Sequence, residues 1–199
     1  MKVTLLVRHA ETAANAAGHI PEVCPGPGLT SEGERAAVML GHHLDSLYRI
    51  DALEGWSSPA LRARQTAHAV LGPDAIIHTD SDLREIAIGR AGTTDRAFIS
   101  WHETLIQSWC AGDRLGEGPA GGETGYEVLS RIDRLEERLS ALHLPVVAVF
   151  SHYGLIRLWV ARHLDASEAV SIHRPELLDV GVVRRSAAGT EFEWLVPPA

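Results

Sequence analysis

Residues 3–9 read VTLLVRH, a short apolar and β-branched run that is followed at once by an arginine and a histidine. Such a run is typical of a strand buried on both faces of a parallel sheet. A second apolar run, residues 146–150, leads in the same way into Ser151 and His152. Ligands of open α/β sheets bind at the carboxyl ends of the strands. If the two strands are neighbours, Arg8, His9 and His152 face one crevice.

Helical and strand-like segments alternate along the rest of the chain. Four helices are predicted before the second histidine. The first covers 31–48, with Ser31 and Glu34 as a capping box, and the second is opened by Ser58 and Pro59. The other two lie near 95–110 and at 126–142. A helix over about 155–164 follows the second histidine. Further strands are predicted at 51–56, 75–78, 181–185 and 191–196, the last two as a hairpin, and residues 13–28 as a loop. This order predicts a single domain over residues 1–199, a three-layer α/β/α fold with a mostly parallel central sheet.

Composition narrows the classes of protein that the chain can belong to. An apolar fraction of 45% and a charged fraction of 22% exclude disorder and fibrous repeats. The formal net charge of -8 argues against a nucleic-acid partner, which requires a basic face. Two cysteines, Cys24 and Cys110, are too few for a disulfide framework or a zinc cage. The apolar runs are too short for a signal peptide or a membrane span, so we expect a cytoplasmic protein without a membrane partner.

Candidate site residues cluster at the predicted strand ends and at one helix start. Five of the eleven histidines, on or next to predicted helices, are expected to be ordinary surface or core residues: His42, His43, His68, His143 and His163. His9 and His152 differ because each directly follows a buried strand. Arg8 lies beside His9, and Arg62 lies in the first turn of a predicted helix. A guanidinium binds phosphate through two parallel hydrogen bonds, and a helix N-terminus adds backbone donors.

Six segments together resemble the histidine phosphatase superfamily, the phosphoglycerate mutase-like proteins. In chain order they are LVRHAETAAN (6–15), LTSEG (29–33), SPALRARQTA (58–67), LRE (83–85), GET (122–124) and SHYGLIR (151–157). The resemblance spans residues 3 to about 160. Two positions depart from the family pattern: Ala10 replaces the usual glycine, and Tyr153 stands where glycine is common. Neither departure removes a chemical group that the mechanism needs.

The resemblance implies a phosphomonoester hydrolase that works through a phosphohistidine, without a metal or another cofactor. His9 would attack phosphorus through one ring nitrogen, while the other donates to a carbonyl that fixes the tautomer. Arg8, Arg62 and His152 would bind the phosphate oxygens. Glu85 would protonate the leaving oxygen and then deprotonate water, which requires a carboxyl kept protonated by apolar burial.

Several residues stay open at this point. Asn15 is a further candidate phosphate donor, or it only shapes its loop. Glu123 is structural or lies at the pocket rim. Arg90, Arg96 and Arg114 are candidates to meet a carboxylate or a second phosphate on the substrate, or they are solvated loop charges. The substrate is expected to be a small phosphorylated metabolite, and the oligomeric state is not predicted.

Three rival functions remain. A phosphoglycerate mutase would use the same chemistry at His9, although 199 residues is the length of the compact phosphatases that the chain resembles. A non-catalytic phosphate-binding protein would be expected to lack one of the five groups that the mechanism needs. All five are present: Arg8, His9, Arg62, Glu85 and His152. A metal-dependent hydrolase is disfavoured because the sequence has neither His-x-x-x-His nor Cys-x-x-Cys spacing.

Overall fold

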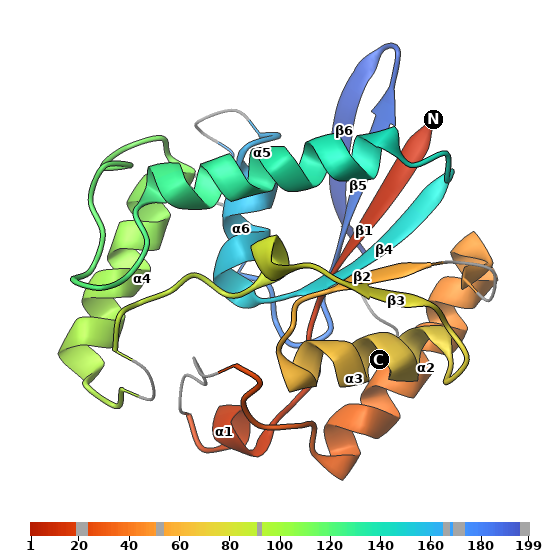
Figure 1. Ribbon diagram of the computed structural model, residues 1–199, viewed down its shortest axis with the longest axis horizontal. Coiled ribbons are helices and arrows are strands. Elements are labelled where there is room, and N and C mark those ends of the chain that lie inside the picture. The colour runs from red at the N-terminus through yellow and green to blue at the C-terminus, as the bar shows by residue number, and fades with distance from the viewer. Residues whose placement is uncertain (19–23, 51–53, 91–92, 165–167, 169–173, 196–199) are drawn as a thin grey trace.

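Six strands form one mixed sheet in the computed structural model, which describes residues 1–18, 24–50, 54–90, 93–164, 168 and 174–195. The strands are β1 (Lys2–Arg8), β2 (Gly55–Ser57), β3 (Ile77–Thr79), β4 (Val146–Ser151), β5 (Val180–Ser186) and β6 (Gly189–Leu195). Their order is β3-β2-β4-β1-β5-β6 (Figure 1). The first four strands are parallel, and β5 and β6 join antiparallel at one edge. The predicted mostly parallel sheet is confirmed.

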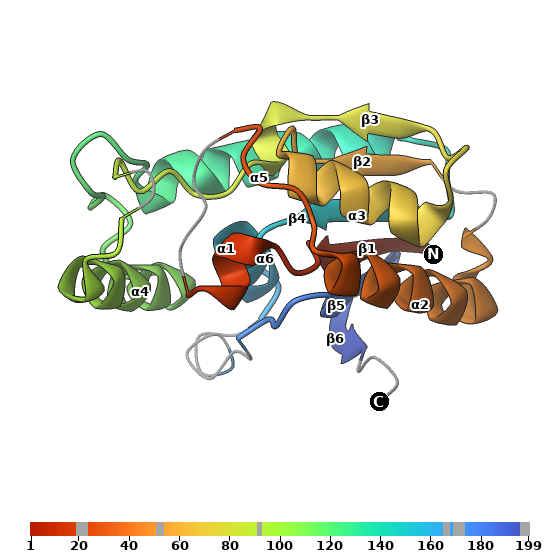
Figure 2. The same cartoon turned by 90° about the horizontal axis from the view of Figure 1, so that it is seen from below.

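Helices cover both faces of this sheet (Figures 1 and 2). They are α1 (Ala13–Ala16), α2 (Ser31–Tyr48), α3 (Leu61–Leu71), α4 (Arg96–Cys110), α5 (Gly125–Ala141) and α6 (Tyr153–Ala161), with a short 3-10 helix at Ser81–Leu83. Alternate residues of the central strands serve opposite cores. Leu6 and Val149 pack with α4, α5 and α6, whereas Leu5 and Phe150 pack with α2 and α3. This alternation produces the three predicted layers.

Strands β1 and β4 are direct neighbours in the middle of the sheet. They pair in parallel, with Arg8 opposite Ser151 at their carboxyl ends. The backbone N–H of His9 donates to the Ser151 carbonyl at 3.0 Å, so the pairing extends to the residue that follows the strand. The two histidines that follow these strands therefore enter the same crevice, as the sequence indicates.

Two predicted helix caps are wrong, although α2 has the bounds predicted for it. Helix α2 is capped by Thr30, whose Oγ1 accepts from the Gly33 N–H at 3.0 Å, and not by Ser31 with Glu34. Thr30 also donates through Oγ1 to Glu11 at 2.9 Å, which holds it in the capping position. Helix α3 begins at Leu61 after Ala60, not at Pro59.

Two further predictions differ in extent from the structure. The predicted loop 13–28 includes a helical turn, α1, closed by a capping box between Thr12 and Asn15. The predicted strand 51–56 is reduced to Gly55–Ser57 within the described residues, since 51–53 lie outside them.

Candidate active site

His9 is a buried residue with its two ring nitrogens in different surroundings. Its side chain is 4% exposed. Nδ1 lies 2.8 Å from the Ala10 carbonyl oxygen, which can only accept, so Nδ1 carries the proton. Nε2 accepts from the Nε of Arg62 at 3.1 Å. The expected tautomer, with one nitrogen tied to a carbonyl and the other holding a lone pair, is therefore present.

Arg62 connects the two histidines. It lies in the first turn of α3, as the sequence predicts, and is 3% exposed. Its Nη2 donates to Nδ1 of His152 at 3.1 Å, while its Nε donates to His9. Its Nη1 is buried and has no hydrogen-bond partner among the described residues. A buried donor without a partner is costly, and an anionic oxygen in the site would satisfy it.

His152 is fully buried at the N-cap of α6. Because its Nδ1 accepts from Arg62, its Nε2 carries the proton and donates to Oγ of Ser58 at 2.7 Å. Burial, His9 and Arg62 together hold the pKa of His152 well below its ordinary value. The imidazole rings of His9 and His152 stand 5.2 Å apart between centroids. The site is built from two neutral imidazoles joined by one guanidinium.

Arg8 adds a second guanidinium at the end of β1. Its Nη1 donates to the Pro175 carbonyl at 2.7 Å. Its Nε is buried and has no partner within the described part of the chain. Two arginine side chains that converge on His9, each with a buried donor unused, fit an anion with several oxygen atoms.

Glu85 lies at the opposite side of this site, against the start of α6. Its Oε1 accepts from the backbone N–H groups of Ile86, Gly154 and Leu155 at 2.9, 3.1 and 3.2 Å. The apolar burial expected for this carboxyl is not observed, because the side chain is only partly buried and faces N–H donors at a helix N-terminus.

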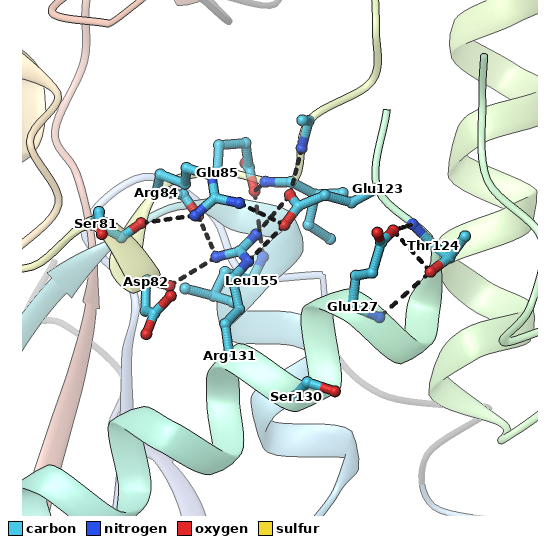
Figure 3. Close-up of polar contacts among 12 residues, drawn as sticks. Ser81, Asp82, Arg84, Glu85, Glu123, Thr124, Glu127, Ser130, Arg131 and Leu155 are labelled. Carbon is cyan, nitrogen blue, oxygen red and sulfur yellow. Dashed lines mark hydrogen bonds and ion pairs between the residues drawn. The ribbon is translucent and has the colours of Figure 1, made fainter. Parts of the chain in front are cut away.

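Glu123 is structural. It accepts from Nε of Arg131 at 2.9 Å, from Arg84 at 2.8 Å and from the backbone N–H of Ala87 at 2.8 Å (Figure 3). Arg131 is 1% exposed and also donates to the carbonyls of Asp82 and Arg84. These bonds fix the segment on either side of Glu85, which positions that carboxyl without bringing Glu123 into the site.

A cavity of about 520 Å³ opens from His9 toward α4. Its inner end is lined by Arg8, His9, Asn15, Arg62 and Glu85. Its walls combine five aliphatic side chains with polar ones: Ile86, Ile88, Ile99, Ile106 and Leu177 beside His102, Glu103, Tyr153 and Glu176. The inner end thus suits a phosphoryl group, and the aliphatic part of the walls suits an apolar portion of the molecule that carries it.

Of the four remaining residues whose role the sequence leaves open, one lines this cavity and three lie outside it. Asn15 lines the cavity, and its Oδ1 accepts from the Thr12 N–H at 3.2 Å, so it shapes its loop as well. Arg96 lines a more open hollow beside the cavity. Arg90 pairs with Asp95 at 3.6 Å and Arg114 with Glu117 at 2.6 Å, outside the cavity.

Two positioning residues were not identified from the sequence. Thr66 accepts through Oγ1 from the Ala10 N–H at 3.0 Å and donates to the Arg62 carbonyl at 2.7 Å, which ties the His9 loop to α3. Ser58, expected to be a helix cap, instead orients His152. The sequence around Thr66 does not indicate that this residue binds the loop after His9. That contact is seen only once α3 packs on the loop.

The depressed histidine pKa values make acid sensitivity a testable property of this site. Burial, reinforced by the charge of Arg62, lowers the pKa of His9 from 6.5 to about 3. Between these values the unfolded chain binds a proton that the folded protein excludes, so stability is lost as the pH falls below 6.5. We expect His9 alone to cost about 2 kcal/mol of unfolding free energy between pH 8 and pH 5.

Urea unfolding of the wild type and of His9→Gln at both pH values measures this difference. The glutamine variant is expected to lose about 2 kcal/mol less than the wild type over the interval, and His42→Gln, at an exposed position, to behave as the wild type. Equal losses in the wild type and His9→Gln would show that His9 is not held neutral by its surroundings.

Neither a metal cluster nor a membrane-spanning helix occurs among the described residues. These residues contain no group of three or more His, Cys, Asp or Glu side chains that could hold a metal ion. They also contain no helix that is long and apolar enough to cross a membrane.

Comparison with known proteins connects this geometry to a family. The chain is 33% identical over 172 residues to the adenosylcobalamin/alpha-ribazole phosphatase of Salmonella typhimurium, covering 84% of this chain and 82% of that one. It is 34% identical over 92 residues to a 2,3-bisphosphoglycerate-dependent phosphoglycerate mutase of Thermoplasma acidophilum, covering 46% and 44%. The crystal structure of the alpha-ribazole phosphatase from Shigella flexneri matches with a TM-score of 0.75 at 25% identity, covering 97% and 95%.

The family model covers nearly the whole chain. The model of the histidine phosphatase superfamily, branch 1, matches residues 4–194, which include every residue that lines the site described above. With six strands in one mostly parallel sheet and the histidines of β1 and β4 at its carboxyl edge, this chain belongs to the histidine phosphatase superfamily.

Proposed function

We propose that this protein is a metal-independent phosphomonoesterase that hydrolyses a small phosphorylated metabolite through a phosphohistidine at His9. One observation carries the proposal. Nδ1 of His9 donates to the Ala10 carbonyl, and the lone pair of Nε2 accepts from Nε of Arg62 at 3.1 Å. A nucleophile therefore lies beside a cation that can hold the group under attack.

The reaction follows from the contacts of each group. Nε2 of His9 forms a bond to phosphorus as the bond from phosphorus to the ester oxygen breaks. The buried donors of Arg8 and Arg62 bind the phosphoryl oxygens, where charge builds up, and neutral His152 holds Arg62 in place through Nδ1. Glu85, in its protonated form, gives its proton to the departing alkoxide. Water then attacks phosphorus while Glu85 takes a proton from it. The bond between phosphorus and Nε2 breaks, which releases orthophosphate and regenerates free His9.

Relatives support hydrolysis rather than transfer. The relative that aligns over 84% of this chain is named a phosphatase, whereas the mutase aligns over less than half of it. The aliphatic part of the cavity walls favours a leaving group with some apolar surface. A mutase would form the same phosphohistidine and pass the phosphoryl group to a second hydroxyl, so the two functions differ only in the acceptor.

Phosphate release from 4-nitrophenyl phosphate in excess chelator tests the function. Sustained turnover is expected, and a panel of small phosphorylated metabolites would follow. Loss of activity on chelation would overturn metal independence. Isomerisation of phosphoglycerate faster than phosphate release would identify a mutase, and binding of phosphate without turnover a recognition protein.

Glu85→Gln is expected to affect esters according to their leaving groups. An alkoxide requires a proton as it departs, whereas 4-nitrophenolate does not. The value of kcat/KM, which reports the first chemical step, is expected to fall about 10²- to 10⁴-fold for an alkyl phosphate. For 4-nitrophenyl phosphate it is expected to change much less. Equal losses on both esters, measured beside the wild type, would contradict the role of Glu85 as the acid.

A further inference from the structure

Tyr153 lies between two guanidinium groups at the edge of the site. It is the first residue of α6, directly after His152. The Cζ of Arg8 stands 5.2 Å from the centre of the tyrosine ring, and the Cζ of Arg157 stands 5.8 Å from it. Both distances are within the range in which a cation is attracted to an aromatic face. The ring therefore connects a phosphate-site arginine with an arginine of the protein interior.

A closed set of hydrogen bonds fixes the tyrosine ring. Its hydroxyl donates to Oε1 of Glu103 on α4 at 2.6 Å and accepts from Nη1 of Arg157 at 3.0 Å. The same Nη1 donates to Glu103 at 2.6 Å, and the Arg157 side chain is 1% exposed. Three side chains from two helices thus hold one another, and the ring position follows from helix packing.

Few other contacts hold the guanidinium of Arg8 in place. Its Nη1 is held by the Pro175 carbonyl, and its Nε is buried without a partner among the described residues. A contact with a ring face leaves the N–H groups in the guanidinium plane free to bind oxygen. The tyrosine ring can therefore orient Arg8 without using the donors that a phosphoryl group needs.

We propose that Tyr153 is a positioning residue that holds the Arg8 guanidinium in place to bind the phosphoryl group, and that Glu103 and Arg157 fix Tyr153 for this task. The inference rests on the proposed phosphatase activity. It also accounts for an aromatic side chain at a position where the sequence motif commonly has glycine. The role requires the ring face, whereas the hydroxyl only fixes the ring.

Two substitutions separate the ring from its hydroxyl. Tyr153→Leu removes the ring, and the KM for 4-nitrophenyl phosphate and the inhibition constant of orthophosphate are both expected to rise about 5- to 30-fold. Tyr153→Phe keeps the ring and is expected to stay within about threefold of the wild type. Tyr126→Leu, an exposed tyrosine on α5, is the matched control and should change neither value.

A double-mutant cycle with Arg8→Ala shows whether Tyr153 acts through Arg8. In the Arg8→Ala background, Tyr153→Leu is expected to leave orthophosphate inhibition unchanged. The same loss in both backgrounds, or Tyr153→Leu equal to the wild type, would overturn the inference while leaving the phosphatase activity intact. If Tyr153→Leu does not fold, Tyr153→pentafluorophenylalanine tests the same contact, because it keeps the ring shape and removes the negative face; inhibition equal to that of Tyr153→Phe would refute the role.

Discussion

His9→Ala is expected to abolish turnover, with a loss in kcat on the order of 10⁴-fold or more. The reason is chemical, since His9 lines the cavity together with Arg8 and Arg62, whereas His152 does not line it. His152, the other histidine of the site, has its Nδ1 occupied by Arg62 and its Nε2 by Ser58. Removal of Nε2 of His9 thus removes the covalent intermediate and not only a contact.

Steady-state phosphate release from wild-type and His9→Ala protein measures this effect. Orthophosphate binding by the variant provides the control, because the arginine donors remain and binding is expected to persist. His42→Ala, at an exposed position on α2, should keep full activity. A variant at His9 that retains more than about one hundredth of the wild-type rate would contradict covalent catalysis at this residue.

Arg62→Ala is expected to lower kcat/KM about 10²- to 10³-fold. Arg62 serves three groups at once: it donates to His9 and to His152, and its buried Nη1 is available for a phosphoryl oxygen. Loss of the guanidinium therefore weakens phosphate binding and frees both imidazoles. Arg64→Ala, an exposed arginine two residues further along α3, is the matched control and should not alter kcat/KM.

The same variant makes a second prediction that concerns protonation. The charge of Arg62 lowers the pKa of His9 and of His152 in addition to the effect of burial. Both values are expected to rise in Arg62→Ala, and ¹⁵N chemical shifts of the imidazoles across a pH titration measure them. Unchanged histidine titration together with unchanged kcat/KM would show that the guanidinium does not act on this pair.

Much of the fold could be predicted because buried parallel strands have a strong local signature. The runs that became β1 and β4 are apolar on both faces, and each is followed by the polar residues of the site. His9, Arg62 and His152 could be brought together from sequence because strand ends and a helix start share the carboxyl edge of such a sheet.

The remaining features depend on contacts between distant segments. Thr30, which caps α2 in place of Ser31, has its hydroxyl bound by Glu11 from a distant segment, a contact that the local sequence does not reveal. The surroundings of Glu85 depend on where α6 begins, and local sequence around Glu85 contains no trace of those N–H donors. The network of Tyr153 with α4 requires the packing of two helices that are about fifty residues apart in sequence.

Trapping of the intermediate tests the central claim most directly. Wild-type protein mixed with a phosphomonoester is quenched in alkali, digested and analysed by mass spectrometry within one turnover. The account predicts a phosphoryl group on His9 that is stable in alkali, is lost in acid, forms at least as fast as phosphate is released, and is absent from His9→Ala. Turnover without a phosphorylated His9, or a phosphoryl group on another residue, would contradict it.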